Sequence, residues 1–387
     1  MQRLLVVLAV LLAGCPAVQP APQAPLQPGV PVSPGGPRIS WTRVATAADL
    51  PPAPAPGSFQ VHMIDVGTGL AILLRGADFA LLYDAGTNDR DERPMRVAAY
   101  LAAVLGPSGD DLCVPAGHAV PTARRRIDHV VLSHPHLDHA SALDLVIHCY
   151  DVPNFWDSGR VNETVFYREL LSGIARSVPT TYRTAAAVPE DRGVHVKGLT
   201  VTVPRWLRFS ENDVVELGEG ARFRILHAEA KAHADPNRNS LVLAVDLGGI
   251  RVLLVGDAES GARLDPTYPA GDVEEFLIAQ HTAAIRADIL QVGHHGSKTS
   301  SRRSFLEQVR PRLALISSGP KRYGKVTLPD REVLEELVRI GATILRTDEH
   351  DGACPVTGRI GGDHGPGGCD SWVITIDQRD DAPPVSR

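Results

Sequence analysis

The sequence lacks three features that would assign a function class directly. Lysine and arginine (39) are fewer than aspartate and glutamate (45), so the formal net charge is −6. The chain has no overall electrostatic signature of nucleic-acid binding, although a local basic patch stays open. Beyond the N-terminus no apolar run is long enough for a membrane helix. No Cys-x-x-Cys pair occurs, which argues against a zinc knuckle.

What remains is the composition of a globular protein. The 387 residues are 43% hydrophobic and 22% charged, which suffices for one large domain or two smaller ones. No internal repeat is visible, so a repeat architecture is not expected.

The N-terminus predicts export. Arg3 precedes the apolar run 4–13, which is too short to span a bilayer and typical of a signal peptide. Leu12-Ala13-Gly14-Cys15 resembles the lipobox of bacterial lipoproteins, in which the cysteine carries the lipid. We predict a signal peptide over 1–15 with lipidation at Cys15, and an ordinary signal peptide is the alternative. Pro16 favours the periplasmic face of the outer membrane or the cell surface.

Proline predicts a spacer after the signal peptide. Residues 16–57 hold 12 of the 31 prolines, and such a segment is expected to be a semi-rigid linker. The linker would hold a folded domain, predicted over 58–380, away from the membrane.

Four cysteines remain in the predicted domain. An even number in an exported chain predicts two disulfides. Four cysteines can pair in three ways, and we prefer the pairing of sequence neighbours, Cys113 with Cys149 and Cys354 with Cys369. The alternative is that each cysteine is a buried thiol. The candidates are Cys113, Cys149, Cys354 and Cys369.

Hydrophobic periodicity predicts mixed β-sheets with helices outside them. An antiparallel opening is expected from three strands that follow one another, and a hairpin is expected at 240–259. The predicted strands include 59–67, 70–76, 79–86, 127–133, 194–203, 221–227, 240–249, 250–259 and 371–377, with a further strand starting at 287. The predicted helices include 92–106, 140–150, 163–177, 272–281 and 330–341.

A histidine-rich motif, "HPHLDH", follows the predicted strand at 127–133. His134 and His136 are two apart on an extended segment and therefore point the same way. Asp138 and His139 follow where the chain turns into a helix and can face a second ion. Imidazole and carboxylate are common zinc ligands and also suit manganese or iron. The motif predicts a metal site, and a merely polar loop is the alternative.

Further ligand types occur at other strand ends. "LLVGDAE" places Asp257 where a strand ends, and a carboxylate there could bridge two metals. "VGHHGSKTS" places His294 and His295 in a similar position, and "YDAG" does so for Asp84. Each alone would be an ordinary turn residue, and their coincidence with the first motif makes them candidates.

Taken together, these motifs resemble the metallo-β-lactamase fold of metal-dependent hydrolases. More closely, the segment 58–377 resembles the soluble domain of the ComEC family of DNA-internalisation competence proteins, in which it is attached to a membrane channel. The channel is absent here, where the predicted lipid anchor and spacer stand instead. The segments that carry the resemblance are "FQVHMIDVGTGLAILLRG", "LLYDAG", "VVLSHPHLDHASAL", "NSLVLAVDLGGIRVLLVGDAE", "ADILQVGHHGSKTSS", "ISSGPKRYG" and "ILRTDEHDG".

The resemblance implies an αββα four-layer sandwich, an α/β fold with two mixed sheets, and one or two divalent ions, Zn²⁺ or else Mn²⁺, that activate water. It implies catalytic roles for Asp138, Asp257 and Lys298. The implied metal ligands are His134, His136, Asp138, His139, Asp257, and His294 or His295. The implied substrate-binding residues are Asp65, Asp84, Ser297, Lys298, Thr299, Arg322, Tyr323 and Lys325. Lys298, Arg302, Arg303, Lys321 and Arg322 would form a basic edge, or else an ordinary solvated surface.

The sequence departs from the family pattern in three respects. Thr68 and Leu70 replace Gln and Asp in the first motif. Lys325 stands where the family usually has a histidine, which would weaken one metal site if that histidine is a ligand. The histidine that precedes the bridging aspartate elsewhere in the superfamily has no clear counterpart, and His227, His233, Asn237 and Asn239 are the candidates.

The sequence therefore predicts an exported, lipid-anchored and monomeric metal-dependent hydrolase. The first prediction is a phosphodiesterase or nuclease acting on nucleic acid or nucleotides. Hydrolysis of a lactam, lactone or thioester is the second. A degenerate domain that binds DNA or an envelope partner around a structural metal is the third.

Overall fold

The computed structural model of the chain describes residues 37–89, 95–114, 123–178, 180–354, 358–361 and 367–378. The predicted signal peptide (1–15), the lipidation site Cys15 and the predicted linker up to residue 36 lie outside the described residues. Within the described ranges, no helix combines the length and the apolar character needed to cross a bilayer.

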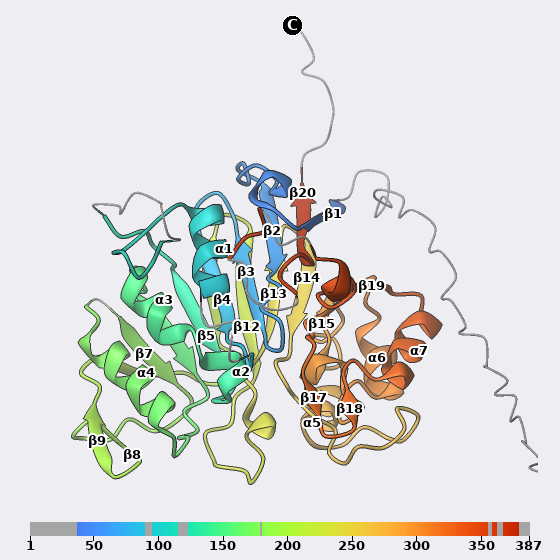
Figure 1. The fold of residues 1–387 in the computed structure, drawn as a ribbon. Helices are drawn as coiled ribbons and strands as arrows, with labels where there is room; N and C mark the ends of the chain where they lie inside the picture. Colours follow the sequence, from blue (N-terminus) through green and yellow to red (C-terminus); the bar gives the residue numbers. More distant parts are fainter. Residues whose placement is uncertain are drawn as a thin grey trace, which may run out of the picture.

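Two β-sheets pack face to face at the centre of the molecule (Figure 1). The described strands of the first sheet lie in the order β1 (Arg38–Val44), β20 (Ser371–Asp377), β2 (Ser58–Met63), β3 (Ala71–Arg75), β4 (Ala80–Ala85), β5 (His129–Leu132), β6 (Asn154–Asp157), β7 (Thr181–Thr184) and β10 (Trp206–Arg208). Those of the second lie in the order β11 (Val214–Gly218), β12 (Ala221–His227), β13 (Val242–Leu247), β14 (Ile250–Leu254), β15 (Ile289–Gln291), β16 (Leu313–Ile316) and β19 (Thr343–Arg346). Two small hairpins join β8 (Gly193–Val196) to β9 (Leu199–Thr202) and β17 (Arg322–Tyr323) to β18 (Val326–Thr327).

Helices cover the outer face of each sheet (Figure 1). The first sheet carries α1 (Met95–Leu105), α2 (Leu137–Ala140), α3 (Leu143–Cys149) and α4 (Val165–Arg176). The second carries α5 (Asp272–His281), α6 (Arg303–Val309) and α7 (Arg331–Arg339). Short 3₁₀ turns occur at η1 (Ala47–Asp49), η2 (Pro236–Asn239), η3 (Gly293–Gly296) and η4 (Asp351–Ala353). The predicted αββα sandwich is confirmed.

The hydrophobic strands explain the layering. In β3, Ile72 and Leu74 belong to the core between the sheets, whereas Leu73 belongs to the core under α1, α3 and α4. Successive strand residues face opposite sides, so a strand buried on both faces is apolar throughout. The third core, under α5, α6 and α7, includes Leu253 of β14 and Leu277 of α5. Each such fully buried side chain contributes about 1.5–3 kcal/mol.

The predicted domain start at residue 58 is wrong. Arg38–Val44 forms β1, which pairs antiparallel with β20 along its whole length, from Arg38 opposite Asp377 to Val44 opposite Ser371. The strand contains no proline and two of its side chains, Ile39 and Val44, are buried. Because prolines lie on both sides of this segment, the proline-rich composition of 16–57 concealed it.

Both predicted disulfides are present. Cys113 pairs with Cys149, with Cα atoms 5.5 Å apart, and Cys354 pairs with Cys369, with Cα atoms 5.8 Å apart. The first joins the loop after α1 to the end of α3, and the second closes the segment before β20. The nearest-neighbour pairing is therefore confirmed.

A buried carboxyl group on α5 supports the loop that follows η3. Glu274 is 2% exposed and accepts hydrogen bonds from the Ser260 hydroxyl and from the backbone N–H groups of Ser301 and Arg302. Burial outweighs these hydrogen bonds and raises the pKa of Glu274 to about 7. The folded protein therefore holds this proton at pH values where the unfolded chain has lost it.

We expect Glu274 to make the protein less stable as the pH rises from about 4.5 to about 7, on the order of 3 kcal/mol in total. A raised carboxyl pKa stabilises the folded state below the unfolded pKa, and this stabilisation is lost as the pH rises through the folded pKa. Chemical denaturation between pH 5 and pH 8 tests this. Glu274→Gln should show a weaker pH dependence than the unaltered protein, and equal slopes would exclude the assignment.

Candidate metal centre

The first half of the site is the turn between β5 and α2. β5 ends at Leu132, and the turn is fixed because the N–H of Leu70 donates to the Asp138 carbonyl at 3.0 Å. His134 and His136 point together, with Nε2 of His134 2.9 Å from Nδ1 of His136. Asp138 and His139 occupy the first turn of α2 and are buried.

The second half comes from the ends of β14 and β15 in the other sheet. Asp257 follows β14 after Gly256, whose φ is +56° and whose added Cβ would lie 2.6 Å from the Cβ of Ser133. Only glycine allows the two sheet ends to approach this closely. His294 and His295 lie in η3, directly after β15, with φ values of 48° and 53°.

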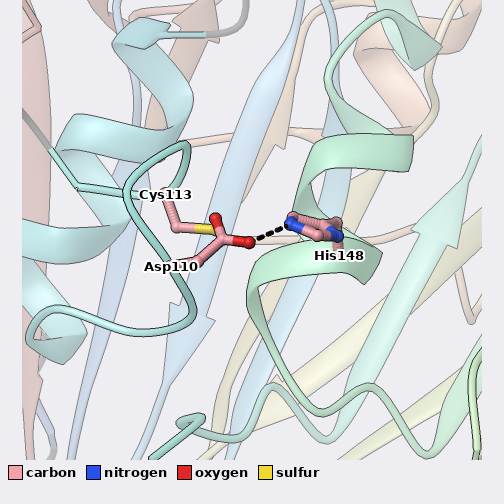
Figure 2. Close-up of side chains that lie close together, drawn as sticks. All are labelled: Asp110, Cys113 and His148. Carbon is pink, nitrogen blue, oxygen red and sulfur yellow. Dashed lines mark hydrogen bonds and ion pairs between the residues drawn. The ribbon is translucent and has the colours of Figure 1, made fainter. Parts of the chain in front are cut away.

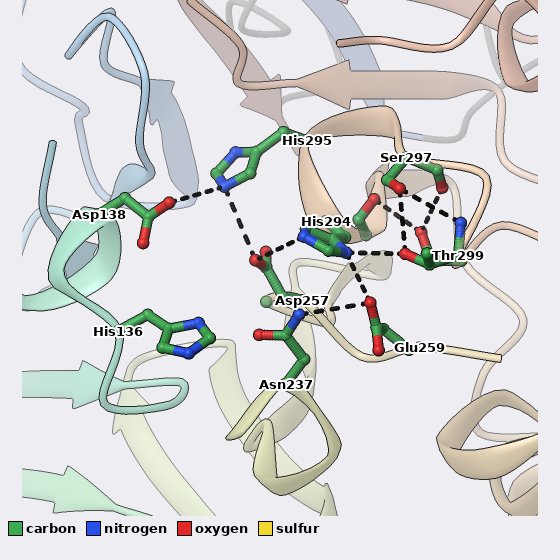
Figure 3. Close-up of polar contacts among 12 residues, drawn as sticks. His136, Asp138, Asn237, Asp257, Glu259, His294, His295, Ser297 and Thr299 are labelled. Atoms are coloured by element: carbon green, nitrogen blue, oxygen red, sulfur yellow. Dashed lines mark hydrogen bonds and ion pairs between the residues drawn. The ribbon is translucent and has the colours of Figure 1, made fainter. Parts of the chain in front are cut away.

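His294 and His295 point toward the Asp257 carboxylate, and Asp138 faces His295 (Figure 3). Oδ2 of Asp257 lies 3.2 Å from Nε2 of His139, 3.7 Å from Nε2 of His295, 3.8 Å from Nε2 of His294 and 3.9 Å from Nε2 of His134. Nε2 of His295 is also 3.7 Å from Oδ2 of Asp138.

The ligand atoms form two groups that share one histidine. One contains His134, His139 and Asp257, and the other contains Asp138, His139 and His295; within each group the atoms lie within 4.8 Å of one another. Such spacing suits ions held at ligand distances of about 2.0–2.2 Å.

Unpartnered polar atoms test whether the residues fit a metal. Nε2 of His295 and Oδ1 of Asp257 are fully buried and make no hydrogen bond, and Nε2 of His139 is equally buried and lies 3.2 Å from Oδ2 of Asp257 without a well-oriented hydrogen bond. Leaving such atoms without a partner costs about 1–3 kcal/mol each. Their grouping around one point is what a cation-binding site requires, so the donor set fits divalent metal ions.

The charges are strongly coupled. Burial opposes ionisation of Asp257, but the imidazoles of His139, His295 and His294 hold the pKa of its carboxyl well below the usual range. Burial also opposes protonation of His139, yet the carboxylates of Asp257 and Asp84 raise the pKa of this histidine well above the usual range. The centre thus stabilises positive charge, as a cation site does.

Asp84, predicted to bind substrate, instead holds the centre in place. It is completely buried, and its Oδ2 lies 2.8 Å from Nδ1 of His139. The same carboxylate accepts hydrogen bonds from the N–H and the hydroxyl of Ser133, both at 2.7 Å. A carboxylate on the far nitrogen of a ligating histidine fixes its tautomer and orientation.

We expect Asp84→Asn to weaken metal binding by about 10–100-fold, as loss of such a partner usually does. The amide has one acceptor oxygen, so its NH₂ group would face either the N–H of Ser133 or Nδ1 of His139. A competition titration against a chelating indicator measures the affinity. Unchanged affinity would show that Asp84 does not position His139.

Glu259 and Asn237 complete the centre. The sequence analysis did not identify Glu259, and it named Asn237 as a candidate without favouring it. Oε1 of Glu259 lies 2.8 Å from Nδ1 of His294, and Nδ2 of Asn237 donates to Oε1 of Glu259 at 3.3 Å (Figure 3). His294 is also 2.8 Å from the hydroxyl of Thr299. Glu259 ends the "GDAE" motif, so its place two residues after Asp257 was the available signal.

Four other predicted substrate or catalytic residues have structural partners. Asp65 is 2% exposed and accepts from the N–H groups of Gly67, Gly368 and Asp370. Ser297 is 2% exposed and accepts a hydrogen bond from Arg263, and the Thr299 hydroxyl lies within hydrogen-bond distance of His294.

Lys298 forms an ion pair on the protein itself, because its Nζ lies 2.8 Å from Oε1 of Glu332. The predicted catalytic role of Lys298 stays a prediction.

The predicted basic edge is also incorrect in part. Arg302 is 1% exposed and its guanidinium donates to the carbonyls of Ala262, Leu264 and Asp265. Arg303 pairs with Glu336. Arg302 is therefore enclosed and cannot offer charge to a ligand, and the charge of Arg303 is paired with Glu336.

The hairpin β17–β18 keeps three predicted residues exposed. Arg322, Tyr323 and Lys325 all lie on it. Partial burial and the Asp138 carboxylate raise the pKa of the Tyr323 hydroxyl. Lys325, which stands in place of the family histidine, is exposed between β17 and β18.

His227 does not join the two ligand groups within the described residues. Its Nδ1 is 2.7 Å from the Ser240 carbonyl, and its ring packs edge-on against Phe276. The prediction that His227 supplies a metal ligand is not supported.

The Metallo-beta-lactamase superfamily profile matches residues 64–319 of the chain. ComE operon protein 3 of Bacillus subtilis is 26% identical over 296 residues, which cover 75% of this chain and 32% of that protein. Recombination protein 2 of Haemophilus influenzae is 29% identical over 293 residues, covering 75% and 28%. Competence protein ComA of Neisseria gonorrhoeae is 28% identical over 289 residues, covering 74% and 31%.

The chain thus spans less than a third of the length of these curated relatives. The predicted resemblance to ComEC-type competence proteins is confirmed. Among solved structures, YhfI of Bacillus subtilis, a metallo-beta-lactamase fold protein, has a TM-score of 0.41 at 12% identity, covering 74% of this chain and 96% of that one. Human tRNase Z, short form, has a TM-score of 0.37 at 15% identity, covering 70% and 95%.

Proposed function

The chain belongs to the metallo-beta-lactamase superfamily, and we propose that it is a metal-dependent phosphodiesterase acting on nucleic acid. The observation that carries the proposal is the pair of ligand groups sharing His139, with unpartnered buried atoms on His295 and Asp257. The competence and recombination proteins among the relatives support a DNA substrate.

We assign the ligands as two sets around Asp257. His134, His136 and His294 form one set, and Asp138, His139 and His295 form the other; His139, which belongs to both groups of close ligand atoms, is assigned to the second set. His294 takes the place of the histidine that precedes the aspartate elsewhere in the superfamily. Two observations support this assignment. Nε2 of His294 lies 3.8 Å from Oδ2 of Asp257, and Glu259 orients the ring through Nδ1. Divalent ions there would acidify a water molecule and polarise the scissile phosphate.

The surrounding residues keep the ligands ready for this chemistry. Asp84 and Glu259 orient His139 and His294 through their far nitrogens, and the Ser317 carbonyl does so for His295 at 2.9 Å. Asn88 donates to Oδ2 of Asp138 at 2.8 Å. Fixed ligands avoid reorganisation when the substrate reacts.

The exposed hairpin beside the centre is the proposed substrate contact. Arg322 and Lys325 offer positive charge to a phosphate backbone, and the ring of Tyr323, 38% exposed, offers a surface for a base. Lys321 adds charge, with Nζ 5.2 Å from the centre of the Tyr323 ring. Export, lipid anchoring through Cys15 and a monomeric state remain part of the proposal.

A hydrolysis assay tests the function. Purified protein loaded with Mn²⁺ or Zn²⁺ should cleave DNA and a generic phosphodiester, and excess DNA should inhibit cleavage of the generic ester. His134→Ala should lose both activities. Cleavage of a lactam or lactone without phosphodiester cleavage would replace this proposal by the alternative hydrolase, and no turnover with any metal would exclude an enzyme.

A further inference from the structure

A second group of ligand-type side chains surrounds the disulfide between Cys113 and Cys149. Nε2 of His148 lies 2.7 Å from Oδ2 of Asp110 (Figure 2). Sγ of Cys113 lies 3.4 Å from Oδ1 of Asp110. One ligand atom from each of Asp110, Cys113 and His148 falls within 4.8 Å of the others. Cys149 lies outside this group of three, but it is bonded to Cys113 and would bring a second sulfur to the same place once that bond is broken. We call these four residues the redox cluster.

The backbone around the redox cluster is tightly folded. Gly109 has φ +77°, and a Cβ there would lie 2.6 Å from Sγ of Cys113 and 3.0 Å from Cα of Cys149. The Ser108 hydroxyl donates to the Cys149 carbonyl at 2.6 Å, and the N–H of Cys113 donates to the Asp110 carbonyl at 3.0 Å. The turn and the end of α3 are therefore held together by more than the disulfide.

The turn also has the spacing of a zinc half-site. Asp110 and Cys113 are separated by two residues, as paired ligands in structural zinc sites commonly are. The other two ligands, His148 and Cys149, are adjacent at the end of α3. A carboxylate, an imidazole and two thiolates are all established zinc ligands. The chain has no Cys-x-x-Cys pair, but Asp110 and Cys113 have the same spacing.

We propose that the redox cluster binds one zinc ion when its disulfide is reduced. Zinc bonds of about 2.0–2.3 Å separate tetrahedral ligand atoms by roughly 3.3–3.8 Å. For the pairs Asp110–His148 and Asp110–Cys113, the observed distances of 2.7 Å and 3.4 Å need changes of about an ångström or less, and the Cys149 sulfur would move to the ion after the S–S bond is broken. The Asp110 and His148 side chains are 48% and 50% exposed, so an ion can reach the site from solvent.

Replacement of the disulfide by zinc takes two steps, in which atoms and electrons balance. A dithiol reductant transfers two electrons and two protons, which breaks the S–S bond, leaves two thiols and converts the reductant to its own disulfide. Zn²⁺ then binds both sulfurs as thiolates and releases two protons to solvent. His148 gives up its hydrogen bond to Asp110, and both side chains turn to the ion.

This exchange preserves a structural link under reducing conditions. The disulfide joins the turn at 108–113 to α3, and α3 directly follows the metal-binding turn at His134–His139. Zinc would make the same connection without the S–S bond. The centre at Asp257 would keep its support in either redox state.

Cobalt(II) is the probe, because only thiolate ligands give its intense near-ultraviolet charge-transfer band, and the Asp257 centre contains no sulfur. The host is the full chain carrying Cys15→Ser, Cys354→Ser and Cys369→Ser, which removes the other disulfide and leaves Cys113 and Cys149 as its cysteines. After reduction, this protein should bind one more cobalt equivalent than before reduction and develop the thiolate band. Zinc should displace that cobalt and abolish the band.

The variants His148→Ala and Asp110→Asn change half-exposed side chains and should fold normally. We expect each to weaken thiolate-band cobalt binding by about tenfold or more, since each removes one of four ligands. Glu169→Gln, an exposed change on the adjacent α4, is the matched control and should bind normally. The proposal is overturned if reduction produces no thiolate band, or if His148→Ala and Asp110→Asn bind cobalt as tightly as the control.

Discussion

Asp257→Asn is expected to lower phosphodiesterase turnover by about a thousandfold or more. Its carboxylate lies within 3.9 Å of four histidines, so its charge holds both proposed ions. Metal-ion catalysis contributes several kcal/mol of transition-state stabilisation, and each 1.4 kcal/mol is a factor of ten in rate. Steady-state hydrolysis of a phosphodiester with saturating Mn²⁺ measures the loss.

Asp246→Asn is the matched control for this change. Asp246 lies on β13 and pairs with Arg251 at 2.7 Å, at the end of the hairpin away from Asp257. Its loss should leave turnover unchanged, as expected for a partly exposed ion pair. If Asp257→Asn keeps a turnover close to that of Asp246→Asn, Asp257 is not part of the catalytic centre.

Gly86→Ala is expected to damage both stability and activity although Gly86 contacts no substrate. A Cβ at this position would lie 2.4 Å from the carbonyl carbon of Asp138 and 2.5 Å from the nitrogen of His139. Since both are backbone atoms, no side-chain rotation relieves the overlap. We expect a loss of about 1–3 kcal/mol in stability and, because the ligand turn is displaced, about a hundredfold in turnover.

Gly173→Ala provides the comparison for the glycine change. Gly173 lies inside α4, and an added Cβ meets nothing within 4 Å. Alanine there should raise stability by about 0.5–1 kcal/mol and leave turnover unaltered. Thermal denaturation and hydrolysis rates of both variants test the pair, and equal behaviour of the two alanines would refute the close-contact explanation.

Much of the arrangement of sheets and helices was predictable, because it depends on hydrophobic patterns within single strands and helices. Apolar strands such as β3 and β14, and the glycine stop after α1, give clear periodicity and punctuation in the sequence. The motif at His134–His139 predicts a metal site because two histidines separated by one residue project together. The nearest-neighbour disulfides follow from the small sequence separations of 36 and 15 residues.

The remaining features depend on tertiary contacts. β1 forms only by pairing with β20, more than 300 residues away, so composition misassigned it to the linker. Asp84 lies near the end of β4 and Glu259 follows β14, yet only the fold shows that they contact His139 and His294. Lys298 stands next to the right motif but extends to Glu332 on α7, and sequence position cannot give a side chain's direction.

Metal stoichiometry of the oxidised protein tests the central claim most directly. After saturation with Mn²⁺ or Zn²⁺ and removal of free metal, elemental analysis should find two ions per chain. A variant combining His139→Ala with Asp257→Asn should lose both, because these residues supply the two ligand groups. Equal metal content in the two proteins would contradict a metal centre at this site.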